Sequence, residues 1–360
     1  MTPHRSRALA WVPLGVCVAM AFGCASERSA STGASAVAPS VAAPMAVVPS
    51  YIRIHQTNRV ISLDIALRRF TPRRQDSPSV WLVGVTHIGD PKYYAELQSF
   101  LASQAVVLFE GVRPDSAARA TATPEEAARI RRSAEDSLQG SMARSLGLAF
   151  QLSAIDYSKA NFQHSDLSLA EIQALMRAHP PKADPSSKLA RDASSPKQNA
   201  EFNLLLQAMD NASWLNQFLR ALFGVLESSP RLQTLSKLAM IRVMGAVGDE
   251  LQAAGQASQG MGQLLEVLLS ARNERVLTDL KAALKPSRNS AGVAVFYGAG
   301  HMKDMASRLQ SQLKYEMREE RWMQAFTVDL DSAGISGFEE RMIDSLVAAQ
   351  IRSLGLGPSR

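Results

Sequence analysis

The chain has 360 residues, of which 46% are hydrophobic and 20% are charged, enough for one large or two small folded domains. Its 39 Lys and Arg against 33 Asp and Glu give a formal net charge of +6, and no basic cluster is interleaved with aromatic residues. We therefore expect no nucleic-acid partner, and at most a mild attraction to an anionic surface.

The first predicted element is an export signal. Residues 1–7 carry two arginines and no acid, and residues 8–23 form an apolar run that is too short and too rich in Gly and Ala for a membrane span. The run ends in Phe-Gly-Cys24, and a small residue before a lone cysteine resembles a lipobox, in which the cysteine is lipidated and becomes the new N-terminus. We predict a signal peptide over 1–23 and lipidation of Cys24; ordinary signal-peptide cleavage nearby is the alternative.

Lipidation would make the chain an exported lipoprotein of the bacterial cell envelope, anchored in the outer membrane and facing the periplasm. Because Cys17 would leave with the signal, the mature chain would keep one cysteine and could form no internal disulfide or Cys-ligated metal site. Residues 24–50 are rich in Ala, Ser and Pro and almost uncharged, which predicts a flexible tether. The folded domain is expected over 51–360.

The first half of this domain predicts alternating strands and helices. Residues 60–67 alternate in polarity, which predicts a half-exposed edge strand. Residues 80–85 are continuously apolar, as in a strand covered on both faces, and an Asp-Pro pair at 90–91 then begins a helix. Residues 105–109 return to a buried strand. This β-α-β unit predicts two parallel, neighbouring strands.

The second half predicts a long helical middle and a return to the sheet. A short strand is expected near 152–156, helices follow over about 200–251 and 264–284, and the sheet resumes at 293–297. A further helix then leads to a last strand near 325–330. The fold class predicted from this order is α/β, with a central mixed, mostly parallel sheet, flanking helices and a large helical insertion over about 165–263.

Two segments at the ends of predicted strands, 84–87 and 298–301, share the spacing Gly-x-x-His and end at His87 and His301. Each follows a buried strand on the turn that leads toward a helix, where glycine lets the backbone bend without a Cβ clash. Both histidines are therefore expected at the carboxyl edge of the sheet, which is where ligands bind in open α/β folds.

Glu110 ends the strand that is expected to lie beside the strand of His87. A carboxylate there needs a partner, because an unpaired buried charge is costly. Two imidazoles and one carboxylate with an open position for water form the ligand set of hydrolytic zinc sites, and also suit manganese or cobalt. His87, Glu110 and His301 are therefore candidate metal ligands, whose ion would activate water. The alternative is that both histidines cap or pack and that Glu110 pairs with an arginine.

The helix predicted over 264–284 adds two polar residues that face the core. Asn273 falls inside its apolar stripe and Arg272 on the shoulder. Polar groups that face a core normally have a specific partner, so Arg272 could hold Glu110 or a developing oxyanion. The alternative is an arginine that lies along the core and extends outward to solvent.

Two further polar segments are candidates for the site, and they have a simpler interpretation. The segments 156–157 and 164–166 follow a predicted strand and could flank the site, but Asp166 is interpreted more simply as the N-cap of a helix over 167–176. The sequence contains no Gly-x-Ser-x-Gly elbow, which counts against an α/β-hydrolase triad.

Four motifs together resemble the TraB/GumN family, which is shared with Tiki-type proteases and more distantly with erythromycin esterases and ChaN-type haem-binding lipoproteins. They are a first Gly-x-x-His, a strand-ending Glu, an Arg-Asn helix and a second Gly-x-x-His, at 82–89, 107–111, 271–275 and 297–302. The resemblance covers 79–112 and 265–305 well, and the middle of the chain hardly at all.

The resemblance implies that His87, Glu110 and His301 form the site and that Arg272 is its essential arginine. The implied activity is that of a metal-dependent hydrolase, with Mn, Co or Zn, which cleaves a peptide or small ester substrate. The competing expectation is a non-catalytic envelope lipoprotein that binds haem, a metal or a peptide at the same residues. A third is an inactive relative whose helical middle contacts partners.

Overall fold

The computed structural model describes residues 48–73, 77–111, 137–178, 223–224, 226–247, 261–284 and 292–353, together with three single residues between 112 and 136. The predicted signal peptide, Cys24 and all but the end of the predicted tether lie outside these residues. That end belongs to the fold, because Val48 is buried and the carbonyls of Pro49 and Ser50 accept hydrogen bonds of 2.8 and 2.7 Å from Arg68. The folded domain therefore includes Val48, three residues before the predicted start.

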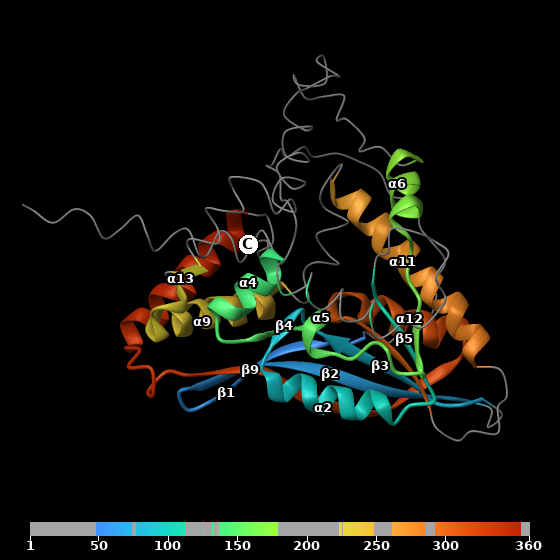
Figure 1. The fold of residues 1–360 in the computed structure, drawn as a ribbon, viewed down its shortest axis with the longest axis horizontal. Helices are drawn as coiled ribbons and strands as arrows, with labels where there is room; N and C mark the ends of the chain where they lie inside the picture. Colours follow the sequence, from blue (N-terminus) through green and yellow to red (C-terminus); the bar gives the residue numbers. More distant parts are fainter. Residues whose placement is uncertain are drawn as a thin grey trace, which may run out of the picture.

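A seven-stranded sheet lies at the centre of the molecule (Figure 1). Its strands are β1 (Ile52–Thr57), β2 (Val60–Pro72), β3 (Val80–Val85), β5 (Val106–Phe109), β7 (Phe162–His164), β8 (Val293–Gly298) and β9 (Tyr315–Asp329). The order is β1-β2-β3-β8-β5-β7, with β9 on the other side of β2. Strands β3, β8, β5 and β7 are parallel, whereas β2 pairs antiparallel with β1, β3 and β9. The predicted α/β class with a mixed sheet is confirmed.

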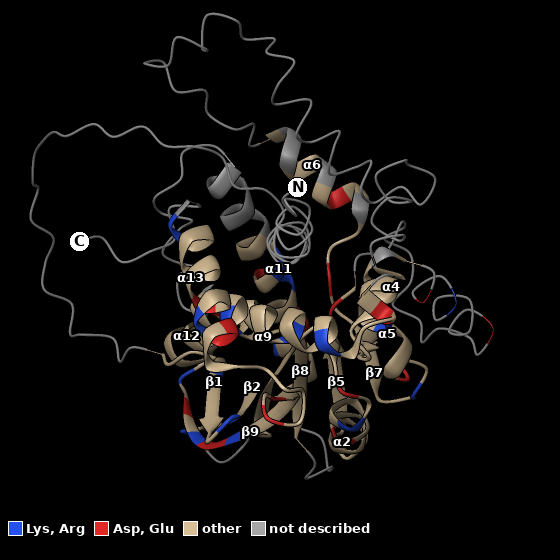
Figure 2. Cartoon of the chain, turned by 90° about the vertical axis from the view of Figure 1, so that its left-hand side faces the viewer, with Lys and Arg blue, Asp and Glu red and all other residues tan. Residues whose placement is uncertain are grey.

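The position of β8 corrects the expectation that the two strands of the β-α-β unit are neighbours. β8 pairs with β3 on one side and with β5 on the other, and Figure 2 shows it between β2 and β5 in the row of strands. A β-α-β pattern predicts parallel direction, but it does not prevent a strand from later in the chain from lying between the two. As a consequence, the end of β8, which leads to His301, lies between the strand ends that lead to His87 and Glu110.

The predicted edge strand at 60–67 is in fact β2, an interior strand. The polar side chains of Ser62, Asp64 and Arg68 are buried and bonded rather than exposed. Ser62 donates to Asp64 over 2.7 Å, and Arg68, which is 0% exposed, donates to Glu320 of β9 over 2.8 Å. The prediction was wrong because alternating polarity indicates exposure only where the polar groups lack protein partners.

Two further strands differ from their predicted bounds. The apolar run near 152–156 lies in a short helix and the turn after it, and the parallel strand is β7, further along the chain. The last strand, β9, begins ten residues before the predicted 325, at Tyr315. Its first half carries alternating charges that pair within it and with β2, as Arg69 does with Glu319, and Figure 2 shows both signs interspersed around β1 and β9. A strand that is stabilised by charge pairs contains no apolar run, so an apolar pattern alone does not predict it.

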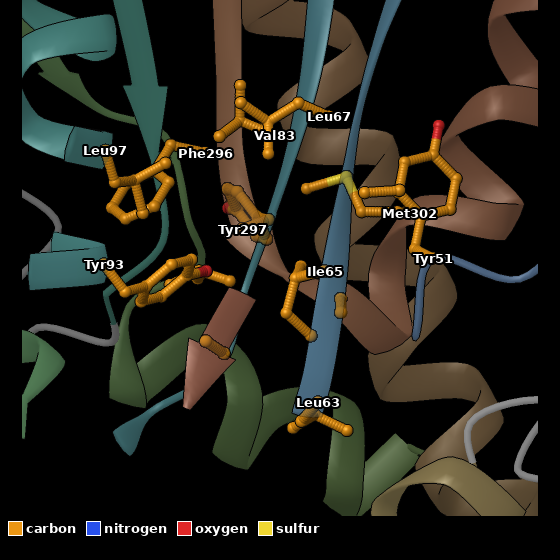
Figure 3. Close-up of a cluster of buried hydrophobic side chains, with 14 of the residues drawn as sticks. Tyr51, Leu63, Ile65, Leu67, Val83, Tyr93, Leu97, Phe296, Tyr297 and Met302 are labelled. Carbon is orange, nitrogen blue, oxygen red and sulfur yellow. The ribbon is translucent and has the colours of Figure 1, made fainter. Parts of the chain in front are cut away.

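Helices cover both faces of the sheet. They are α2 (Pro91–Ala102), α4 (Leu138–Ser145), α5 (Gln151–Ala154), α6 (Leu169–Ala178), α9 (Pro230–Val247), α11 (Met261–Ala283), α12 (Met302–Gln312) and α13 (Gly337–Ser353), with a short 3-10 turn, η2 (Ala299–His301). In Figure 3, Tyr93 and Leu97 of α2 lie on one side of the strands, and Met302 of α12 lies on the other with Tyr51. All four side chains are buried, so the core is continuous through the sheet.

The remaining helices pack at the two ends of the sheet. α9 and α13 contact each other, and α9 rests on β1, β2 and β9 (Figure 1). α11 confirms the helix predicted over 264–284, and it packs against β5, β8 and α12. A two-stranded ladder of β4 (Ile88–Gly89) and β6 (Ala149–Phe150) lies beside the end of β3. None of the helices in the described part of the chain is both long and apolar enough to span a membrane.

Candidate functional site

The candidate site lies where the parallel strands end. His87 follows β3, Glu110 follows β5 directly, Asp166 follows β7, and His301 ends the η2 turn after β8. Arg272 comes from the middle of α11, which packs on β5 and β8. The structure therefore places all four predicted site residues at the carboxyl edge. Asp166, which was predicted to cap a helix, lies there with them.

Arg272 binds two carboxylates at once. Its Nη2 donates to Glu110 over 2.7 Å and to Asp166 over 2.6 Å, and its Nε donates to the second oxygen of Asp166 over 2.9 Å. The Asp166 side chain is 0% exposed, and those of Glu110 and Arg272 are 15% and 18% exposed. The prediction that Arg272 holds Glu110 is confirmed, and the outward-extending alternative is wrong. Two-pronged binding of this kind fixes the guanidinium plane.

The predicted N-cap role of Asp166 was wrong, because the helix that follows it is capped by a different residue. α6 begins after Ser168, whose hydroxyl accepts from the N–H of Glu171 over 3.2 Å while the Glu171 carboxylate accepts from the N–H of Ser168 over 2.7 Å. This is a capping box, and the Ser-x-x-Glu spacing at 168–171 would have revealed it in the sequence. The Asp166 carboxylate instead accepts hydrogen bonds from Arg272 and, over 3.0 Å, from the N–H of Gly111.

Glu110 is held as an anion despite its burial. Burial alone would raise the pKa of its carboxyl, but His301 and Arg272, together with an N–H bond of 2.7 Å from Gly298, outweigh that effect and lower the pKa to about 2. A Cβ on Gly298 would lie only 3.3 Å from the accepting oxygen. The glycine of the second Gly-x-x-His motif therefore allows the carboxylate to approach the backbone closely.

The His301 ring is oriented by Asn273, a fully buried residue of α11. The Asn273 amide donates to Asp304 over 2.7 Å, so its oxygen faces Nδ1 of His301, at 2.8 Å. Because an amide oxygen only accepts, Nδ1 carries the hydrogen and Nε2 keeps its lone pair. Burial lowers the pKa of His301, which keeps the ring neutral. Its Nε2 lies 3.9 Å from Glu110 and 3.5 Å from Nη1 of Arg272.

His87 belongs to the same edge without touching the Arg272 cluster. Its side chain is exposed, and its Nδ1 is hydrogen-bonded to the amide oxygen of Gln151 over 3.2 Å. It is one of the groups that lower the pKa of the Glu110 carboxyl, but no hydrogen bond among the described residues joins it to Glu110, Arg272 or His301. The structure thus brings three of the four predicted residues into contact and places the fourth nearby. Gln151 was not predicted, since one glutamine carries no sequence signal.

A metal ion does not fit this donor set as it is arranged. Both oxygens of Glu110 already accept hydrogen bonds, and the Arg272 guanidinium lies 3.5 Å from the His301 nitrogen that would bind the ion. A fixed positive charge at that distance opposes a divalent cation. Among the described residues, no group of three or more His, Cys, Asp or Glu is placed to hold a metal. The metal-ligand role of His87, Glu110 and His301 stays a prediction that this arrangement does not support.

Comparison of the chain with protein-family models, with curated proteins and with solved structures gave no match. The resemblance to the TraB/GumN family therefore rests on the four motifs, and the chemistry of the site rests on its own geometry.

Glu110 is expected to make stability depend on pH in the acid range. Its pKa falls from 4.5 to about 2 on folding, so its stabilisation is complete above pH 4.5 and is lost as the pH falls toward 2. Urea unfolding of wild type and Glu110→Gln should show a difference in unfolding free energy that shrinks by roughly 3 kcal/mol between about pH 5 and pH 2. Glu96→Gln, at an exposed position of α2, is the control. Parallel curves for wild type and Glu110→Gln would show that the carboxylate is not held in this way.

Proposed function

We propose that the chain is a hydrolase of peptide or ester bonds, in which His301 is the general base and Arg272 stabilises the negative charge of the transition state. The observation that carries the proposal is the 3.5 Å separation of His301 Nε2 from Arg272 Nη1. A proton acceptor and a hydrogen-bond donor lie side by side at the sheet edge where α/β folds bind ligands. Acyl transfer requires this pair of groups.

His301 has the properties of a base. Its Nδ1 proton is bound by Asn273, its ring is neutral, and its Nε2 lone pair faces the Arg272 side of the cluster. In the proposed step Nε2 takes a proton from water while the water oxygen bonds to the substrate carbonyl carbon. The carbonyl π electrons then move to the carbonyl oxygen.

Arg272 has the properties of an oxyanion donor. Its Nε and Nη2 are engaged by Asp166 and Glu110, which leaves the Nη1 hydrogens directed toward the His301 side. Because the two carboxylates already fix the guanidinium plane, Arg272 needs little reorganisation when charge develops on the substrate oxygen. As the intermediate collapses, the carbon–nitrogen or carbon–oxygen bond breaks and the leaving group takes the proton from the His301 imidazolium, directly or by way of Nε2 of His87, so that both rings end neutral.

The resemblance of the four motifs to the TraB/GumN and Tiki pattern supports the same reaction class. The arrangement of Arg272 favours a mechanism that the protein's own side chains perform, rather than the metal-dependent one that the resemblance implies. The competing function, binding of haem, a metal or a peptide without catalysis, uses the same residues and is separated by the following experiment.

Purified protein should hydrolyse members of a panel of fluorogenic peptides and small esters, and should keep its activity after dialysis against a chelator. His301→Ala should lower kcat by about 100-fold or more, because a general base contributes that much. Arg272→Lys, which cannot reproduce the two-pronged geometry, should lower kcat by roughly 100-fold. His55→Ala, an exposed histidine of β1, is the matched control and should leave kcat unchanged.

Two outcomes would contradict this proposal. Loss of activity on chelation and its recovery with Mn²⁺, Co²⁺ or Zn²⁺ would restore the metal-site prediction for His87, Glu110 and His301. Wild-type protein that cleaves no member of the panel, but binds peptide, metal or haem in a manner that His301→Ala weakens, would favour the binding lipoprotein.

We also propose that the chain is an exported lipoprotein of the cell envelope, anchored in the outer membrane on the periplasmic side. The support is the basic start, the apolar run over 8–23 and the small residue before Cys24. Such an anchor would leave residues 24–47 between the lipid and the first described residue, Val48.

Cys24→Ser should therefore abolish incorporation of labelled fatty acid and move the protein from the membrane fraction to the soluble fraction, since two or more acyl chains are what hold such a protein on a bilayer. Cys17→Ser is the matched control and should leave both properties unchanged. A Cys24→Ser protein that still fractionates entirely with membranes would contradict the anchor.

A further inference from the structure

We infer that Gln151 is a positioning residue for His87, which it holds by Nδ1 so that Nε2 is the nitrogen presented at the carboxyl edge, and that Tyr157 holds Gln151 in place. The inference rests on the proposed function, because it assigns His87 a controlled role in the same reaction. Neither Gln151 nor Tyr157 lies in any of the four sequence motifs.

The backbone places Gln151 opposite His87. The ladder of β4 and β6 pairs Ile88 with Phe150, which are the residues next to His87 and Gln151 along the chain. The N–H of Gln151 then donates to the carbonyl of His87 over 2.8 Å. With both backbones fixed, the amide oxygen of Gln151 reaches Nδ1 of the ring over 3.2 Å. His87 is exposed, and an exposed side chain without such a bond exchanges rotamers within nanoseconds.

Tyr157 connects this contact to the strands of the site. The Gln151 amide, which is 3% exposed, donates to the Tyr157 hydroxyl over 3.0 Å. The Tyr157 ring packs against Phe109 of β5 and Phe296 of β8, with ring centroids 4.9 and 6.4 Å apart. β5 carries Glu110 at its end and β8 leads to His301, so the same tyrosine that holds Gln151 also touches the two strands that position the Arg272 cluster.

The arrangement repeats the one at His301. There a buried Asn273 amide binds Nδ1, and here a buried Gln151 amide does the same, from a different element and a different part of the chain. An amide oxygen accepts the Nδ1 hydrogen without the negative charge that would favour the imidazolium. Both rings are thereby kept with the hydrogen on Nδ1 and the lone pair on Nε2.

The experiment reads the ring nitrogens of His87 directly. Nitrogen-15 NMR at about pH 8.5, where an ordinary imidazole is neutral, should show the Nδ1–H tautomer of His87 in wild type. Gln151→Met should shift the ring toward the mixture of tautomers of a free imidazole, and Gln151→Asn, which is one methylene too short to reach, should do the same. Gln151→Glu keeps the acceptor and should retain the Nδ1–H form. Gln98→Met, a half-buried glutamine of α2 that binds the backbone of Asp156, is the matched control.

Activity then separates positioning from stability. Gln151→Met and Gln151→Asn should lower kcat on the order of tenfold with little change in KM, a part of what a proton-transfer group contributes, and Gln151→Glu should recover some of that loss. Identical His87 nitrogen shifts in wild type, Gln151→Met and Gln151→Asn would overturn the inference, whatever the activity. Changed shifts in a protein that hydrolyses nothing would support the inference on His87 and contradict the proposed function.

Discussion

The site depends on one interaction, the binding of the Arg272 guanidinium by Glu110 and Asp166 together. Asp166 is completely buried, and a buried carboxylate that loses its cation typically costs several kcal/mol. The three residues come from α11 and from the ends of β5 and β7, so their ion pair fixes the helix to the sheet edge. Asn273 follows Arg272 in the same helix, and its contact with His301 depends on that fixation.

The strand order determines which groups can act together. Because β8 lies between β3 and β5, His301 is central and its Nε2 reaches both Glu110 and Arg272. His87, which follows β3, is near enough to lower the pKa of Glu110, but its hydrogen bond is to Gln151 and not to the Arg272 cluster. A largely buried histidine beside an arginine, with an exposed histidine nearby, is an arrangement suited to the proton transfers of the proposed hydrolysis. The positive charge of Arg272, 3.5 Å from Nε2 of His301, opposes the binding of a divalent cation there.

The sequence alone predicted what local patterns control. Continuous apolar runs identified β3, β5 and β8, and helical periodicity identified α11. The position of Arg272 on that helix indicated that it could hold Glu110 or a developing oxyanion, and the structure shows the contact with Glu110. Long-range choices were not predictable in this way. The insertion of β8 between its neighbours depends on which hydrophobic strand fills the centre of the sheet. The burial of Arg68 in β2 depends on a polar partner that β9 supplies, Glu320, which lies 252 residues further along the chain. Asp166 directly precedes the predicted helix, so the local pattern indicates a cap, whereas its cation, Arg272, lies 106 residues away in the sequence.

A double-mutant cycle between Asp166 and Arg272 tests the central claim most directly. The unfolding free energies of wild type, Asp166→Asn, Arg272→Met and the double variant would be measured in urea at neutral pH. The account predicts that each single change costs about 3 kcal/mol and that the double change costs clearly less than their sum, with a coupling energy of about 1 kcal/mol or more. A parallel cycle on the exposed pair Arg318 and Glu316 should give a coupling near zero. Additive costs at Asp166 and Arg272 would contradict the account.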